Sequence, residues 1–196
     1  LKSKFKDFKN KFKLIRDPIF SYSDLIEIRK KNKNFTKENF YISAGRLTKQ
    51  KNFSFLVKGV HEYNRINKKK INVIVIGDGE DRNKLINLTK TLKVEEYIKF
   101  VGFKKNVFKY FLNAKALICT SLWEDPGFVI IESGIVNLPV ISNSCKSGPV
   151  EIIKHEENGY LFSYNSMNDF LKQLKNFENE DQKSINKKIN NMKKFS

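Results

Sequence analysis

Short apolar runs and segments of helical spacing alternate along residues 40–178 of the chain. Most of the runs end at a turn that contains glycine, and Leu85, Leu88 and Leu92 recur at the three- and four-residue spacing of an amphipathic helix. The expected strands are residues 41–44, 71–76, 97–101, 116–120, 139–142 and 160–162. Six strands with five intervening helical segments predict βα units around a parallel sheet, in an α/β fold of the doubly wound, Rossmann-like kind.

Three regions follow from where this alternation begins and ends. We expect residues 1–38 to form a linker helix and the segment that leads into the domain, and residues 39–178 to form the Rossmann-like domain. Residues 179–196 are rich in lysine and asparagine and are expected to be a polar, partly helical tail. Within the domain, the run 71–76 is apolar on both faces except at Asn72, as expected of a central strand covered by helices on each side.

The chain is strongly basic, with 38 Lys and Arg against 21 Asp and Glu and a net charge of +17. Such a charge suggests nucleic acid, anionic lipid or a phosphate-bearing substrate as a partner. The lysines are spread from end to end, which favours a solvated basic surface over one focused patch. Phe5, Phe8 and Phe12 share one face of a basic amphipathic segment, which either docks on an anionic membrane surface or packs on the domain as a connecting helix.

The two cysteines, Cys119 and Cys145, do not make a disulfide framework, so a reducing compartment is expected. We find no apolar run of the ~18 residues that span a membrane, and no signal-peptide pattern at residues 1–4. These features predict a cytoplasmic protein, with peripheral contact to the inner face of the membrane as a further expectation. The first residue is not methionine, which is consistent with a piece of a longer protein.

Ligands of open parallel sheets bind outside the carboxyl ends of the strands, so the turns at those ends are the candidate sites. After the first strand, the Gly45 turn places Arg46 and Lys51 near the start of a helix. Two cations beside free helical N–H groups suit a diphosphate. In a chain so rich in lysine, the spacing of these residues by itself is weak support.

Gly77 and Gly79 follow the second strand and would let the backbone approach a ligand closely. Arg82 stands where a dinucleotide-binding fingerprint requires a third glycine, so that fingerprint is excluded. Taken by itself, this segment is explained better by a tight strand-to-helix turn than by a ligand site.

An acid pair follows the fourth strand. Glu124 lies in the turn, Pro126 and Gly127 suit the opening of a helix, and Glu132 falls after the apolar stretch 128–131. Two carboxylates at this spacing can reach an extended, polyhydroxylated ligand, and the alternative places Glu132 on a solvated helix face.

Several short segments, in this order, resemble the C-terminal, donor-binding domain of the retaining GT-B glycosyltransferases of the group 1 or family 4 type. The resemblance covers about residues 14–175 and predicts one half of a GT-B architecture. The matching segments are Gly45-Arg46-Leu47 with Lys51, Gly77-x-Gly79, Val101-Gly102-Phe103, Glu124 with Glu132, Leu138-Pro139-Val140-Ile141, Gly148-Pro149-x-Glu151-Ile152-Ile153 and Asn158-Gly159.

The resemblance implies roles for these residues. Arg46 and Lys51 would hold the diphosphate of a UDP-, GDP- or ADP-sugar, and Glu132 would bind the ribose hydroxyls. Glu124, with the backbone of Gly127 and Phe128, would face the donor sugar. The turns with Gly45, Gly77, Gly79 and Gly102-Phe103 would surround the nucleotide, the last of them near the base.

Two differences from the family pattern stand out. Residues 124–127 replace the usual Glu-Gly-Phe-Gly, and Pro126 has no N–H to offer a ligand. The family's N-terminal, acceptor-binding domain has no counterpart in this sequence and is an expected partner, so we expect this chain alone to transfer no sugar. Two cations in place of a metal, and no spaced cluster of metal ligands, predict a metal-free reaction with no cofactor.

The resemblance implies transfer of a sugar with retention to a glycan or a lipid-linked acceptor of cell-surface polysaccharide synthesis. One alternative is a nucleotide-sugar epimerase of GT-B type, which matches the acid pair and the Gly-Arg-Leu segment less well. The other is a non-enzymatic basic module that binds nucleic acid or a membrane. No nucleic-acid recognition motif accompanies the charge, so nucleic acid is not an expected partner.

Overall fold

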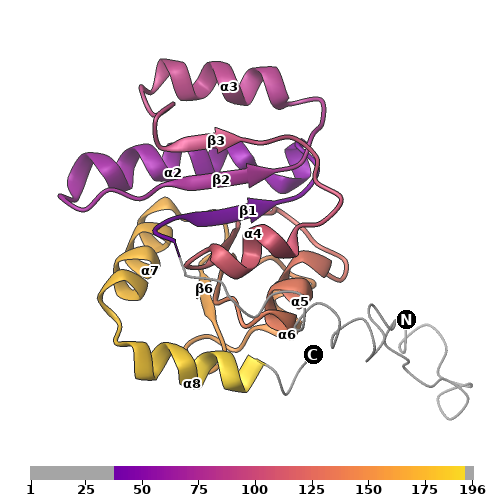
Figure 1. Cartoon of the computed structure of the whole chain (residues 1–196), viewed down its shortest axis with the longest axis vertical. Helices are drawn as coiled ribbons and strands as arrows, with labels where there is room; N and C mark the ends of the chain where they lie inside the picture. Colours follow the sequence, from indigo (N-terminus) through magenta and orange to yellow (C-terminus); the bar gives the residue numbers. More distant parts are fainter. Residues whose placement is uncertain (1–37, 193–196) are drawn as a thin grey trace, which may run out of the picture.

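The computed structural model describes residues 38–192 (Figure 1). The expected Phe5, Phe8 and Phe12 stripe lies outside the described residues. A six-stranded parallel sheet has the order β3-β2-β1-β4-β5-β6. Its strands are β1 (Tyr41–Ala44), β2 (Val73–Ile76), β3 (Ile98–Phe100), β4 (Leu117–Cys119), β5 (Val140–Asn143) and β6 (Tyr160–Phe162). The predicted doubly wound α/β fold is confirmed.

Helices cover both faces of the sheet. They are α2 (Phe53–Ile66), α3 (Arg82–Thr91), α4 (Phe108–Asn113), α5 (Phe128–Ile135), α6 (Pro149–Ile152), α7 (Met167–Asn179) and α8 (Gln182–Met192), with a 3-10 turn, η2 (Lys49–Lys51), before α2. Successive strand residues point to opposite faces, so Tyr41 packs with α2, α3 and α7, whereas Ile42 packs with α4 and α5. Two apolar clusters therefore make the core, one on each face.

The strand order reverses between β1 and β4, which lie side by side in the middle of the sheet. The chain runs outward from β1 through β2 to β3, and then returns to β4 and runs outward through β5 to β6 (Figure 1). The segment 71–76, expected to be the central strand, gives β2, which is interior but one strand from the edge. Such a reversal leaves a crevice at the carboxyl ends of the two middle strands.

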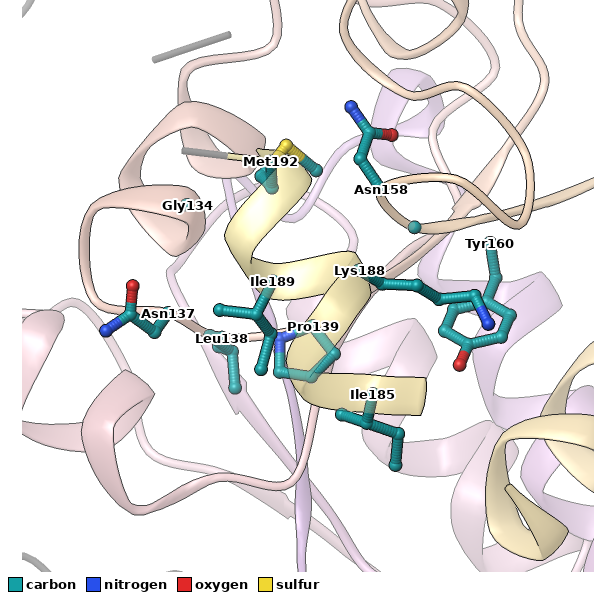
Figure 2. Close-up of a pocket in the computed structure, with 11 residues that line it drawn as sticks. Gly134, Asn137, Leu138, Pro139, Asn158, Tyr160, Ile185, Lys188, Ile189 and Met192 are labelled. Atoms are coloured by element: carbon teal, nitrogen blue, oxygen red, sulfur yellow. The ribbon is translucent and has the colours of Figure 1, made fainter. Parts of the chain in front are cut away.

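The helix α8 in the segment 179–196 packs against the domain (Figure 2). Met192 at its end is 4% exposed, and Lys188 pairs with Glu180 beside the ring of Tyr160. The cavity under α8 holds about 10 Å³, which leaves room for a single water molecule at most. This cavity is a packing gap.

Glu178, on α7, joins that helix to the amino ends of the strands. Its carboxylate pairs with Lys115 and with Lys69, the latter at 2.7 Å, and it accepts a hydrogen bond from the Tyr41 hydroxyl. Burial by itself would raise the pKa of Glu178, but these three partners outweigh it and lower the pKa to about 2. The ionised Glu178 therefore stabilises the edge of the sheet opposite the crevice.

Candidate functional site

A cleft of about 720 Å³ opens at the carboxyl ends of β1 and β4, which is within the size range of small-molecule sites. The structure brings together nine of the eleven predicted site residues there: Gly45, Arg46, Lys51, Gly77, Phe103, Glu124, Gly127, Phe128 and Glu132. Gly79 and Gly102 do not line the cleft, although their neighbours Asp78 and Phe103 do.

The two glycines after β2 are explained by the contact between their turn and the turn after β1. A Cβ on Gly77 would lie 1.9 Å from the Gly45 carbonyl oxygen, and one on Gly79 would lie 2.5 Å from the Leu47 carbonyl oxygen. The Leu47 N–H donates to the Asp78 carbonyl at 2.9 Å. The glycine spacing thus allows the two turns to pack against each other, and this contact fixes the backbone of the turn that contains Arg46.

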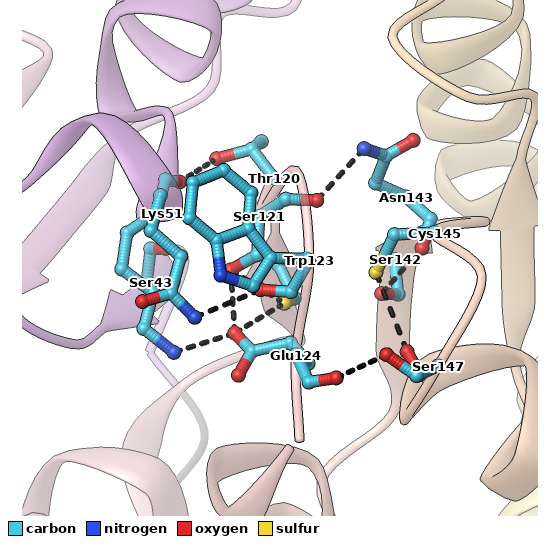
Figure 3. Close-up of polar contacts among 12 residues, drawn as sticks. Ser43, Lys51, Thr120, Ser121, Trp123, Glu124, Ser142, Asn143, Cys145 and Ser147 are labelled. Atoms are coloured by element: carbon cyan, nitrogen blue, oxygen red, sulfur yellow. Dashed lines mark hydrogen bonds and ion pairs between the residues drawn. The ribbon is translucent and has the colours of Figure 1, made fainter. Parts of the chain in front are cut away.

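Lys51 and Glu124 form an ion pair inside the cleft, with Nζ 2.5 Å from Oε1 (Figure 3). The Ser121 hydroxyl donates to the same oxygen at 2.5 Å, and the Ser147 hydroxyl donates to the Glu124 carbonyl. Glu124 is only 4% exposed, so Lys51 and Ser121 satisfy a carboxylate that burial would otherwise make costly, while Ser147 fixes the backbone of Glu124. The pair joins η2 to the turn after β4.

Hydrogen bonds fix these two turns to each other. The Thr120 hydroxyl donates to the carbonyls of Lys51 and Asn52 at 3.0 and 3.2 Å. The Leu122 N–H donates to the Gln50 carbonyl at 2.8 Å, and the Gln50 amide donates to the Trp123 carbonyl at 3.0 Å. Lys51 and Glu124 are therefore presented by one rigid platform.

Glu132 lies on α5, half-buried in the wall of the cleft. Burial raises the pKa of its carboxyl group, and no hydrogen bond or ion pair reaches that group from residues 38–192. Gly127 takes a left-handed conformation (φ 91°) and caps α5, which begins at Phe128 with Pro126 two residues before it. The first N–H groups of α5 lack helical partners, and Gly127, Phe128 and Val129 line the cleft.

Charges of both signs meet in the cleft. The cations that line it are Arg46, Lys51 and Lys104, and the carboxylates are Asp78, Glu124, Asp125 and Glu132. The cleft therefore carries more carboxylates than cations, although the whole chain has a net charge of +17. Arg46 is exposed and makes no ion pair within the described part of the chain, and the ring of Phe103 is 76% exposed at the cleft's edge.

Comparisons with known proteins identify the family of the chain. The model of the family described as glycosyl transferases group 1 matches residues 24–195. The chain belongs to this family. This match confirms the resemblance to group 1 glycosyltransferases.

Two curated relatives of this group 1 glycosyltransferase chain are each 36% identical to it. An uncharacterized glycosyltransferase of Methanocaldococcus jannaschii aligns over 166 residues, which are 81% of this chain and 40% of that protein. The amylovoran biosynthesis glycosyltransferase AmsD of Erwinia amylovora aligns over 141 residues, which are 70% of this chain and 38% of that protein. This chain thus spans about two fifths of their length.

The structure of S. aureus TarM has a TM-score of 0.79 to this glycosyltransferase chain, with 21% identity, over 100% of this chain and 40% of TarM. It shows the same fold. Within residues 38–192, no helix is long and apolar enough to cross a membrane, and no three His, Cys, Asp or Glu side chains are grouped to hold a metal.

The sequence did not indicate several residues of the site in this glycosyltransferase chain. Gln50, Asp125 and Lys104 line the cleft, but nothing in their spacing marks them. Ser121 stands next to the Thr120 that ends the fourth apolar run, so its position at a strand end was the one available signal for it.

Proposed function

We propose that the cleft binds the nucleoside-diphosphate sugar donor of a group 1 glycosyltransferase, and that the complete protein transfers the sugar with retention. The observation that carries this proposal is the placement of Arg46, Lys51, Glu124 and Glu132 in one cleft at the switch point of the sheet.

The charged residues that line the cleft support one orientation of the donor within it. Arg46 and Lys51 would neutralise the diphosphate, together with the helical N–H groups at the start of α5. Glu132, which has no partner among the described residues, would accept hydrogen bonds from the ribose hydroxyls. Phe103 would face the base at the outer edge, and Glu124 would face the sugar.

Catalysis would come from stabilising the charge that develops on the leaving diphosphate. The bond from the anomeric carbon to the diphosphate breaks, the acceptor oxygen forms its bond on the same face of the sugar, and the proton of the acceptor hydroxyl passes to the departing diphosphate oxygen. Arg46 and Lys51 gain interaction energy as the diphosphate becomes more negative, so they stabilise the transition state more than the bound donor. We propose that these two cations carry this role without a metal ion.

We propose that the acceptor is bound by the part of such proteins that this chain does not span. We propose that the acceptor is a glycan or a lipid-linked glycan, because the relatives include a protein of amylovoran biosynthesis. TarM was solved with UDP and alpha-GlcNAc-glycerol, which favours UDP as the first nucleotide to try. We expect this chain alone to bind the donor and to transfer no sugar.

Thermal stabilisation of the chain by UDP, GDP and ADP, and by their glucose conjugates, tests this proposal. A ligand at 100 times its Kd stabilises the folded state by about 2.7 kcal/mol, so the preferred nucleotide should raise Tm by several degrees. A DNA oligonucleotide at two salt concentrations is the control. Stabilisation by DNA that falls steeply with salt, with none by any nucleotide, would favour the basic-module alternative.

A further inference from the structure

Glu124 is held by one of its two carboxylate oxygens. Oε1 accepts hydrogen bonds from Lys51 Nζ and Ser121 Oγ, each at 2.5 Å, and the Cys119 sulfur lies 3.9 Å away. Oε2 receives no hydrogen bond from any residue between 38 and 192, and Figure 3 shows it on the side away from Ser121. Glu124 lines the cleft and Oε1 is already occupied, so Oε2 is the carboxylate oxygen left to accept a hydrogen bond from a ligand.

Lys51, one of the two strong donors to Oε1, also binds the diphosphate under the proposed function. Lys51 is the cation assigned to the diphosphate, and a doubly charged diphosphate competes with Glu124 for it. Once Lys51 Nζ turns to the phosphate, the Ser121 hydroxyl is the strong donor that remains on Oε1. Without Ser121 as well, this 4%-exposed carboxylate would have no strong donor among the described residues, and burial without a donor disfavours an ionised carboxylate.

Among residues 38–192, Lys51 is the one cation that pairs with Glu124; Arg46 and Lys104 line the same cleft but form no ion pair with it. The titratable groups that face it are Lys51 from η2, Cys119 from β4 and Cys145 after β5. Burial raises the pKa of the Cys119 thiol, and it raises the pKa of Cys145 to about 11, so both thiols stay neutral at pH 7. Neutral thiols are weak donors.

We propose that Ser121 is a positioning residue, whose hydroxyl keeps Glu124 ionised and its Oε2 directed into the cleft while Lys51 holds the diphosphate. This inference rests on the proposed function. Ser121 itself need not contact the donor, and it acts through Glu124.

The first test needs no ligand. Lys51→Met imitates the departure of the cation, and ¹³C NMR of the glutamate carboxyls, with the Glu124 signal assigned by its loss in Glu124→Gln, follows ionisation against pH. We expect Glu124 to be ionised at pH 7 in Lys51→Met and to titrate at least about one pH unit higher when Ser121→Ala is added. Adding Ser121→Thr instead, which keeps the hydroxyl, should restore the lower midpoint.

The matched control is Ser142→Ala in the Lys51→Met background, because Ser142 is equally buried and donates to the Asn143 carbonyl instead of Glu124. Equal midpoints for the Ser121→Ala and Ser142→Ala pairs would overturn the proposal. A Glu124 already protonated at pH 7 in Lys51→Met alone would also overturn it.

A second measurement keeps Lys51 and serves if the double variant does not fold. Calorimetric titration with inorganic pyrophosphate, in two buffers of different ionisation enthalpy, gives the protons taken up on binding. We expect Ser121→Ala to take up about half a proton or more beyond the wild type, and Ser142→Ala to match the wild type. Equal uptake in all three would refute the role of Ser121. Failure of the wild type to bind pyrophosphate would refute the proposed function instead, and the NMR result would still decide whether Ser121 keeps Glu124 ionised.

Discussion

Lys51 Nζ lies 2.5 Å from Glu124 Oε1, although 73 residues separate the two in the sequence. The cation assigned to the diphosphate is therefore neutralised, in the ligand-free protein, by the carboxylate assigned to the sugar. Under the proposed function, the diphosphate competes with Glu124 for Lys51, and contacts between Glu124 and the sugar offset part of the free energy that this competition costs.

Replacing Glu124 should separate these two effects. In Glu124→Gln, no carboxylate competes with pyrophosphate for Lys51, so pyrophosphate should bind about 5-fold more tightly, a change of about 1 kcal/mol. The same variant should lose the preference for a sugar nucleotide over the bare diphosphate. Calorimetric titration measures both, and Glu151→Gln, on the exposed surface of α6, is the matched control. Weaker pyrophosphate binding by the folded Glu124→Gln chain would contradict this expectation.

Glu132→Gln should weaken a ribonucleotide about 10-fold and leave its 2′,3′-dideoxy analogue nearly unchanged. The reason is that a carboxylate accepts hydrogen bonds that the analogue cannot donate, and such charged bonds are worth roughly 1.5 to 3 kcal/mol. Equal losses for both ligands would show that Glu132 does not bind the ribose.

The same variant should stabilise the ligand-free chain at neutral pH. Burial raises the pKa of Glu132 above its ordinary value of 4.5, so its ionised form is disfavoured in the folded state and lowers stability once the pH exceeds that ordinary value. Glu132→Gln removes this cost, so its Tm should exceed that of the wild type at pH 7, and the gain should shrink as the pH falls toward 4.5 and be absent below that pH. A lower Tm at pH 7 would mean that the carboxylate has a stabilising partner.

The sequence predicted all six strands because each is a short, mostly apolar run that ends at a turn, as expected of parallel strands covered by helices. The edge strand β3 is the least apolar of them, with Lys99 exposed. The cleft could be predicted for the same reason, since parallel strands bring their carboxyl ends to one edge. The position of β2 within the sheet could not be predicted from its own composition, because β1 and β4 are shorter runs that are buried equally well.

Contacts between distant turns lie beyond what local pattern can predict. The 1.9 Å approach of a Gly77 Cβ to the Gly45 carbonyl, and the hydrogen bond from Ser121 to Glu124, depend on how the turns meet after the sheet has formed. The local pattern of the glycines after β2 predicts a place for a ligand or a tight turn, and neither prediction includes contact with the turn after β1.

Gly77→Ala tests that contact. Its Cβ would collide with the Gly45 carbonyl and could not be relieved by a side chain, so we expect a loss of roughly 2 to 4 kcal/mol in the free energy of unfolding. Gly102→Ala is the control, because no atom lies within 4 Å of its Cβ and only its positive φ costs about 1 kcal/mol. Urea unfolding of both variants checks the difference, and equal losses would refute the importance of the contact between the turns.

Glu178 should make the free energy of unfolding depend on pH in the acid range. Its pKa of about 2 in the folded protein lies below the ordinary 4.5, so its contribution is complete above pH 4.5 and is lost as the pH falls toward 2. Glu178→Gln should therefore cost about 3 kcal/mol at pH 7, and this cost should shrink steadily below pH 4.5. Glu62→Gln, which breaks a surface ion pair with Arg65, should change little. A cost for Glu178→Gln that is independent of pH would contradict the ionic origin.

The central claim is that Arg46 and Lys51 hold the diphosphate of the donor, and calorimetric titration of the double variant Arg46→Ala/Lys51→Ala tests it most directly. The ligands are the nucleoside diphosphate that stabilises the wild type most and the matching nucleoside. Each cation should contribute roughly 1.5 to 3 kcal/mol to diphosphate binding, so the variant should lose at least about 100-fold in affinity for the diphosphate and less than about 3-fold for the nucleoside. Equal losses for the two ligands, in a variant that keeps the fold, would contradict the claim.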